Sequence, residues 1–165
     1  MSADQAARQT AFEAYAAYVE QCYQGEVNGE ALFRALVRAS TDAHAQRKLR
    51  VLEQLERDTK EFLRPAVEET GRSAEEDPKR IATGEKLGTK LADMPWVELM
   101  KVFEDSLVRF VAQFEQSEKL APPGNEPVLA HYTAHERALL EFTRREMRGD
   151  ADSLAPVVAM LRTSS

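Results

Sequence analysis

The chain has 165 residues, 43% of them hydrophobic and 30% charged, which are proportions typical of a single globular domain. Its 28 acidic residues outnumber its 22 basic ones, and the formal charge of −6 argues against a nucleic-acid-binding surface. No run approaches the ~20 apolar residues that a membrane span needs, so we expect no membrane partner. One cysteine excludes an internal disulfide, and the first residues lack the pattern of a secretion signal, so we expect a cytoplasmic protein.

The hydrophobic pattern predicts a first helix over residues 4–39, because apolar residues recur every three or four positions. Gly25 and Gly29 lie inside it and each weaken a helix by about 1 kcal/mol relative to alanine, so a break near Gly25 is the alternative. One acid, Glu26, lies on the apolar face. A carboxylate there must be protonated, hydrogen-bonded, paired or bound to a metal. The face consists of Phe12, Tyr15, Val19, Cys22, Glu26, Gly29, Phe33 and Leu36.

A second helix is predicted between the N-cap residues at 40–42 and Gly71, a residue typical of helix ends. Pro65 should kink this helix, because its ring removes one backbone hydrogen bond. The apolar face of this helix, which includes Leu52 and Leu63, again contains one acid, Glu56. Two successive helices with one inward acid each suggest a polar site inside a helical bundle.

The heights of these acids can be compared by counting from the connection between the two helices. Glu26 lies 15 residues before Thr41 and Glu56 lies 15 residues after it. With a rise of about 1.5 Å per residue, both carboxylates should lie about 22 Å from the turn if the helices are antiparallel neighbours. Two inward carboxylates at one height repel each other unless a proton or a cation lies between them. Glu30 and Glu53 match in the same way one turn nearer the connection, although Glu53 falls at the edge of the apolar face.

The rest of the chain is also predicted to be helical, with no alternation typical of strands. A shorter helix begins at Asp77-Pro78 and extends to about residue 92, and a long helix follows the start signal at 93–95. The turn at 121–125 precedes another long helix over 127–148, and a short C-terminal helix follows residues 150–152. The predicted core includes Phe12, Val19, Phe33, Leu52, Leu63, Trp96, Phe103, Phe110, Leu139 and Phe142.

Further candidate ligands lie on the last two long helices. His131 and His135 are four residues apart, so both imidazoles can reach a common point. On the preceding long helix, Glu104 is the acid best placed for the interior, about one turn from His135 in height. The alternatives are that His135 is a hydrogen-bonded core residue and that His131 is simply exposed.

This arrangement resembles the ferritin-like superfamily, whose members supply a Glu from each of two helices and a Glu-x-x-His from each of two others. Glu26 resembles the first single Glu, Glu56 the Glu of the first Glu-x-x-His, and Glu104 the second single Glu. The resemblance implies a four-helix bundle with a crossover helix and a short C-terminal helix, holding iron or manganese for redox or oxygenase chemistry. The chain departs from the pattern at Thr59, where the first histidine is expected, and lacks a Glu three residues before His135.

Two functions therefore remain open. The first is an iron- or manganese-binding bundle, and the second is a metal-free helical bundle that acts as an interaction or small-ligand-binding module. The sequence leaves the oligomeric state open, although the apolar final helix could cover the seam of a homodimer. Cys22 is expected to be a small core residue. The predicted metal ligands are Glu26, Glu56 and His135, with Glu30, Glu104 and His131 as secondary candidates.

Overall fold

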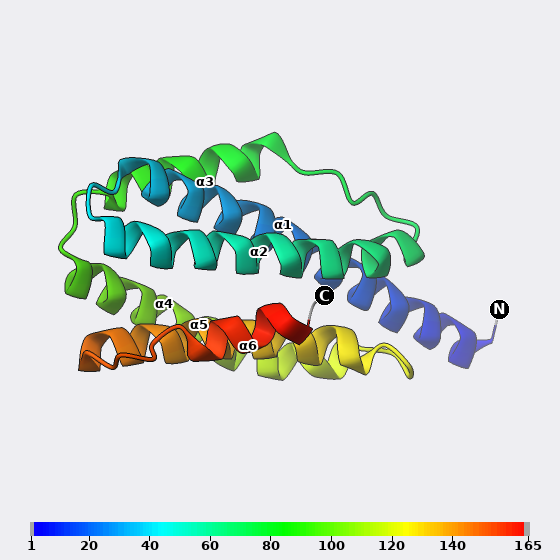
Figure 1. Ribbon diagram of the computed structural model, residues 1–165. Helices are drawn as coiled ribbons and strands as arrows, with labels where there is room; N and C mark the ends of the chain where they lie inside the picture. The colour runs from blue at the N-terminus through cyan, green and yellow to red at the C-terminus, as the bar shows by residue number, and fades with distance from the viewer. Residues whose placement is uncertain (1, 164–165) are drawn as a thin grey trace.

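The computed structural model describes residues 2–163 as an all-helical protein, which confirms the predicted all-α class (Figure 1). The elements are α1 (Ala3–Ala39), α2 (Ala43–Glu69), α3 (Pro78–Leu91), α4 (Trp96–Ser117), the 3-10 helix η1 (Glu118–Leu120), α5 (Glu126–Arg148) and α6 (Ala155–Thr163). Within the described residues there is no strand. None of these helices combines the length and the apolar character that a membrane crossing requires.

Helix α1 continues through both of its internal glycines, so the alternative of a break near Gly25 is wrong. Each glycine lies where another helix approaches closely. A Cβ atom at Gly25 would lie 3.2 Å from the hydroxyl of Tyr132, and one at Gly29 would lie 2.8 Å from Cδ of Glu56. The packing that these glycines allow therefore outweighs the helix stability that they sacrifice.

The predicted helix boundaries agree with the structure where a cap or a left-handed residue defines them. The carboxylate of Asp42 accepts hydrogen bonds from the backbone N–H groups of His44 and Ala45, which begins α2. Gly71 follows the end of α2 with φ +80°, and Gly149 ends α5 with φ +75°, a conformation that glycine adopts without strain. Between its ends, α2 continues through Pro65.

Helix α3 packs tightly along α1 (Figure 1) because two of its residues have no side chain. A Cβ atom at Gly84 would lie 2.9 Å from Cβ of Ala31, and closer still to a backbone carbonyl oxygen of α1. A Cβ atom at Gly88 would meet the carbonyl oxygen of Leu32 at 2.5 Å. The two backbones therefore approach each other at two successive turns.

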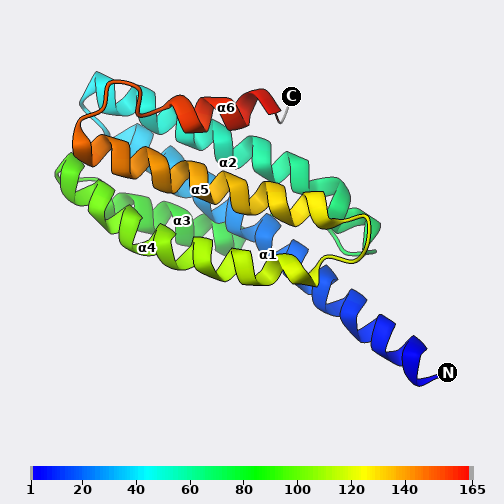
Figure 2. The same cartoon turned by 90° about the horizontal axis from the view of Figure 1, so that it is seen from below.

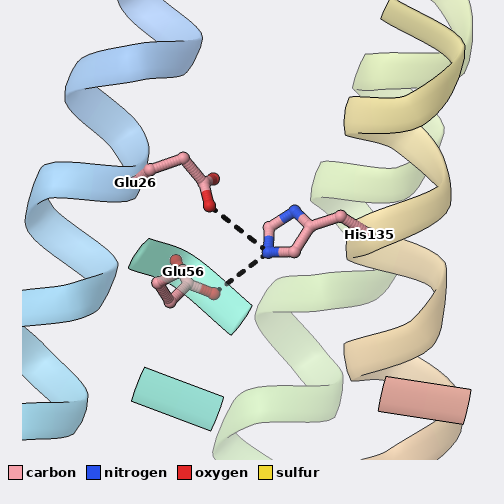
Figure 3. Close-up of side chains that lie close together, drawn as sticks. All are labelled: Glu26, Glu56 and His135. Atoms are coloured by element: carbon pink, nitrogen blue, oxygen red, sulfur yellow. Dashed lines mark hydrogen bonds and ion pairs between the residues drawn. The ribbon is translucent and has the colours of Figure 1, made fainter. Parts of the chain in front are cut away.

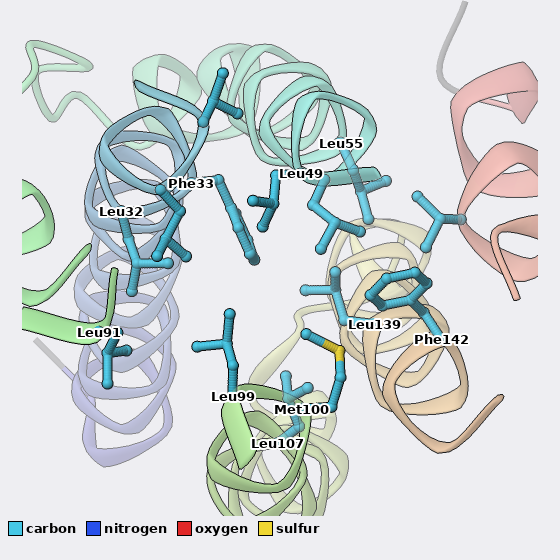
Figure 4. Packing of buried hydrophobic residues seen from close by; sticks show 14 of the residues in the cluster. Leu32, Phe33, Leu49, Leu55, Leu91, Leu99, Met100, Leu107, Leu139 and Phe142 are labelled. Atoms are coloured by element: carbon cyan, nitrogen blue, oxygen red, sulfur yellow. The ribbon is translucent and has the colours of Figure 1, made fainter. Parts of the chain in front are cut away.

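Side chains from α1, α2, α4 and α5 meet in the apolar core that Figure 4 shows. Helices α1 and α2 pack together, as do α4 and α5, while α6 covers α2 and α5. Most of the predicted core residues are buried, and Trp96 and Phe103 are half-buried. The buried ones are Val19, Phe33, Leu52, Leu63, Leu139 and Phe142.

Two of the predicted core residues are exposed, so the prediction is wrong for Phe12 and Phe110. Phe12 lies in the N-terminal part of α1, which extends beyond the other helices (Figure 2), and its side chain is 38% exposed. Phe110 lies at the edge of a cavity between helices. Both follow the apolar period of their helices, but that period does not reveal where the neighbouring helix ends or diverges.

Candidate metal centre

Three helices bring one side chain each to a common point inside the protein (Figure 3). Glu26 comes from α1, Glu56 from α2 and His135 from α5, and all three are buried. Nε2 of His135 lies 3.1 Å from Oε1 of Glu56 and 3.4 Å from Oε2 of Glu26. One ligand atom from each residue lies within 4.8 Å of the other two. The carboxylates of Glu26 and Glu56, which the residue counts placed at one height, are therefore neighbours.

The position of Glu56 depends on the absence of a side chain at Gly29. The carboxylate of Glu56 passes directly beside the backbone of α1, in the space that a Cβ atom at this position would occupy. Gly29 lies three residues after Glu26, so the helix face that presents one acid also accepts the other. The sequence therefore supplies both the two acids and the gap that lets them meet.

A third acid, Glu136, completes the surroundings of His135. Its Oε2 atom lies 3.5 Å from Nδ1 of His135, and Nδ1 has no hydrogen-bond partner. Burial raises the pKa of Glu136 to about 7. Sequence reasoning did not include Glu136 among the candidate ligands. The residue that follows an inward histidine usually lies at the side of the helix, and no pattern indicates that this one is buried.

Burial and mutual repulsion dominate the electrostatics of the site. Burial raises the pKa of Glu26 well above its usual range, and the negative charge of Glu56 raises it further. Burial lowers the pKa of His135, but Glu26 and Glu56 outweigh this effect and raise it to about 10. Without a bound cation, the cluster therefore retains protons at neutral pH.

A single proton on Nε2 of His135 leaves one atom of the cluster without a partner. A protonated Nε2 carries a single hydrogen, which can point at only one of the two carboxylates. Glu56 is the nearer, and Oε2 of Glu26 is buried without a hydrogen bond. A buried oxygen atom without a donor is destabilising by about 1–3 kcal/mol. A second proton shared between Glu26 and Glu56, or a cation placed between the three side chains, would remove this deficit.

Two of the three distances between the donor atoms fit a transition-metal ion. Metal–nitrogen and metal–oxygen bonds are about 2.1 Å long, so two ligands of one ion lie about 3.0 Å apart at a right angle and about 3.4 Å apart at the tetrahedral angle. The two distances from Nε2 are 3.1 and 3.4 Å. Two carboxylates and one imidazole are a suitable set for iron, manganese or zinc.

Glu30, the first secondary candidate, lies outside this cluster and already has cationic partners. It accepts hydrogen bonds from Lys60 at 2.6 Å, from Arg57 at 3.1 Å and from Arg34 at 2.6 Å. Burial raises the pKa of Glu30, but Lys60 and Arg57 outweigh it and hold the pKa below its usual range. Its charge is therefore satisfied by side chains of α1 and α2.

The other two secondary candidates also lie apart from the cluster. Glu104 is half-buried and accepts a hydrogen bond from Nε of Arg144 at 2.9 Å, which places it at the surface between α4 and α5 and not in the expected interior position. The ring of His131 stacks on Phe62 with 3.9 Å between ring centres, and burial lowers its pKa. Thr59 is fully buried, and its hydroxyl has no hydrogen-bond partner.

A cavity of about 410 Å³ adjoins the cluster, and its lining includes Glu26, Glu56 and Glu136.

No protein-family model, curated protein or solved structure matches the chain. The resemblance to the ferritin-like superfamily therefore stays a prediction, and the interpretation of the site depends on its own residues.

Proposed function

We propose that the protein binds one divalent transition-metal ion, iron or manganese, through Glu26, Glu56 and His135. The supporting observation is that three buried donor side chains from three helices converge on one point, where Oε2 of Glu26 has no hydrogen-bond partner. Groups that are this deeply buried need either shared protons or a cation. An ion with two positive charges would neutralise both carboxylates and leave the imidazole uncharged.

The surroundings of His135 support this proposal. Nε2 faces the two carboxylates, so it would bind the ion and the ring proton would move to Nδ1. Nδ1 faces Glu136, and histidine ligands of metals commonly donate their second N–H to a carboxylate. Glu136 would thereby orient the ring without contacting the ion.

The number of ligands favours a single ion. Glu30 is held by cationic side chains, Glu104 pairs with Arg144, and Thr59 replaces a histidine of the ferritin-like pattern. Three protein ligands leave coordination positions for a small molecule, and iron or manganese would supply redox chemistry there. We therefore infer an oxidoreductase or oxygenase on a ferritin-like bundle, in which α3 is the crossover helix.

A second function is favoured by the raised pKa of His135. A protonated imidazole between Glu26 and Glu56 is a self-consistent polar core without any metal. In that case the adjoining cavity would make the protein a small-ligand-binding module. The two functions differ in one measurable property, which is the metal content of the folded protein.

The test is metal analysis of protein purified without chelator from cells supplied with iron and with manganese. We expect one ion per chain in the unaltered protein, much less in Glu56→Gln, and an unchanged content in Glu61→Gln, an exposed acid of the same helix. A bound ion should also raise the melting temperature by mass action. Metal-free protein whose melting temperature ignores both ions would favour the polar core.

A further inference from the structure

The cavity beside the candidate metal centre is predominantly apolar. It lies between the packed pair α1 and α3 and the packed pair α4 and α5. Its acidic side chains are those of Glu26, Glu56 and Glu136, and the lining otherwise consists mostly of large apolar groups. A volume of about 410 Å³ is in the range of sites that bind small organic molecules. The buried apolar part of the wall includes Leu32, Phe33, Leu107, Leu139 and Phe142.

The entrance of the cavity carries exposed apolar side chains. Leu87 on α3 is 40% exposed, and Val102 and Phe110 on α4 are 38% and 44% exposed. Only six large hydrophobic residues are exposed in the part of the chain that the structure describes, and three of them line this cavity. Exposed apolar side chains that line one cavity are typical of a ligand-binding groove. Arg80 is the single basic residue among the described lining residues.

We infer that this cavity binds a small, uncharged, mostly apolar molecule with one oxygen donor, and that the oxygen points toward the metal. The inference depends on the proposed function, because a divalent ion would cancel the charges of Glu26 and Glu56. The inner end of the cavity would then attract a neutral donor. An ammonium group would compete with the metal for the same carboxylates, and an anion would face Glu136.

The length of the ligand should control its affinity. Each methylene group that enters the apolar part of the cavity should tighten binding about fourfold. This increase should end when the chain reaches the exposed side chains of Leu87 and Phe110 at the entrance. A surface that merely adsorbs apolar molecules would show no such limit.

The experiment compares 1-octanol, octylammonium and octanoate, which have the same chain and different head groups. Isothermal titration calorimetry would first measure manganese binding to chelator-treated protein and then the binding of each probe to both forms. We expect 1-octanol to bind the manganese form most tightly and to change the water-proton relaxation caused by the manganese. Tighter binding of octylammonium or octanoate to this form would overturn the inference.

Two variants test whether the probe occupies this cavity. Ser106→Trp places a large ring in the lining, and Lys101→Trp places the same ring on an exposed, non-lining position of the same helix. We expect Ser106→Trp to lower the affinity for 1-octanol at least about tenfold, because it removes space for two or more methylenes. Lys101→Trp should leave this affinity unchanged. If circular dichroism shows that Ser106→Trp is unfolded, Leu87→Trp at the exposed entrance replaces it. Normal affinity in the folded lining variant would overturn the inference.

The outcomes separate the inference from the proposed function. Manganese binding without any 1-octanol binding would overturn only the inference about the ligand. Absence of binding by both manganese and iron would overturn the proposed function, whatever the probes do. Equal 1-octanol affinity with and without bound manganese would overturn the orientation of the oxygen toward the metal.

Discussion

The replacement Gly29→Ala should separate metal affinity from stability. A Cβ atom at this position would lie 2.8 Å from Cδ of Glu56 and closer still to its Oε2, so the carboxylate must leave its present place. Alanine stabilises the interior of a helix by about 1 kcal/mol relative to glycine. Displacing a buried hydrogen-bonded carboxylate from His135 opposes this with about 1–3 kcal/mol. The net change in the unfolding free energy should therefore lie between no change and a loss of about 2 kcal/mol.

The loss of metal affinity should be about 10–100-fold, which corresponds to about 1.4–2.7 kcal/mol, because one of three ligands is misplaced. Urea denaturation of the chelator-treated protein would measure the unfolding free energy, and calorimetric titration with manganese would measure the metal affinity. Gly25→Ala is the matched control, since its Cβ atom would lie 3.2 Å from the hydroxyl of Tyr132 and not against a proposed ligand. Unchanged manganese affinity in Gly29→Ala would refute the assignment of Glu56 as a ligand.

Three further predictions concern neighbouring residues. Glu26→Gln should lower manganese affinity at least about 100-fold with little change in helicity, and calorimetry showing normal affinity would contradict this. Glu30→Gln should lower the unfolding free energy at pH 7 by about 3 kcal/mol, because Lys60 would keep only Glu76 as a partner. The pKa of Glu30 is lowered on folding, so this contribution is complete above the ordinary pKa of 4.5 and is lost as the pH falls through the lower pKa of the folded protein; denaturation curves at pH 7 and pH 3 with equal differences would disprove it. Gly84→Ala should destabilise by about 1–3 kcal/mol in urea, because its Cβ atom would collide with a backbone carbonyl of α1.

The proximity of Glu26 and Glu56 could be predicted because the argument used only quantities that a helix fixes. The rise per residue is constant and the connection at Thr41 is tight, so equal counts place Glu26 and Glu56 at one height. The inward position of each acid follows from its apolar neighbours. The end of α2 near Gly71 could be predicted from the residue type, because glycine adopts the positive φ that this position has.

The predictions that depended on the rotation of a helix about its axis were less successful. The apolar face of α4 is broad, so its period does not decide whether Glu104 or Phe110 faces the interior. Packing against α5 places Glu104 beside Arg144 and leaves Phe110 exposed. The partner of Glu30 was also not predicted, because no local pattern shows that Lys60 on the next helix is buried beside it. Such pairings depend on contacts distant in sequence.

The different contributions of the long helices explain how the proposed metal site and a cavity could coexist. Helices α1, α2 and α5 each supply one residue of the Glu26–Glu56–His135 cluster, whereas α4 supplies none. The side of the cluster that faces α4 is the side on which the apolar cavity lies. A fourth ligand from α4 would close the coordination sphere and block that approach. Its absence would leave a bound ion accessible only from an apolar space, the condition under which an uncharged molecule can replace water at a metal.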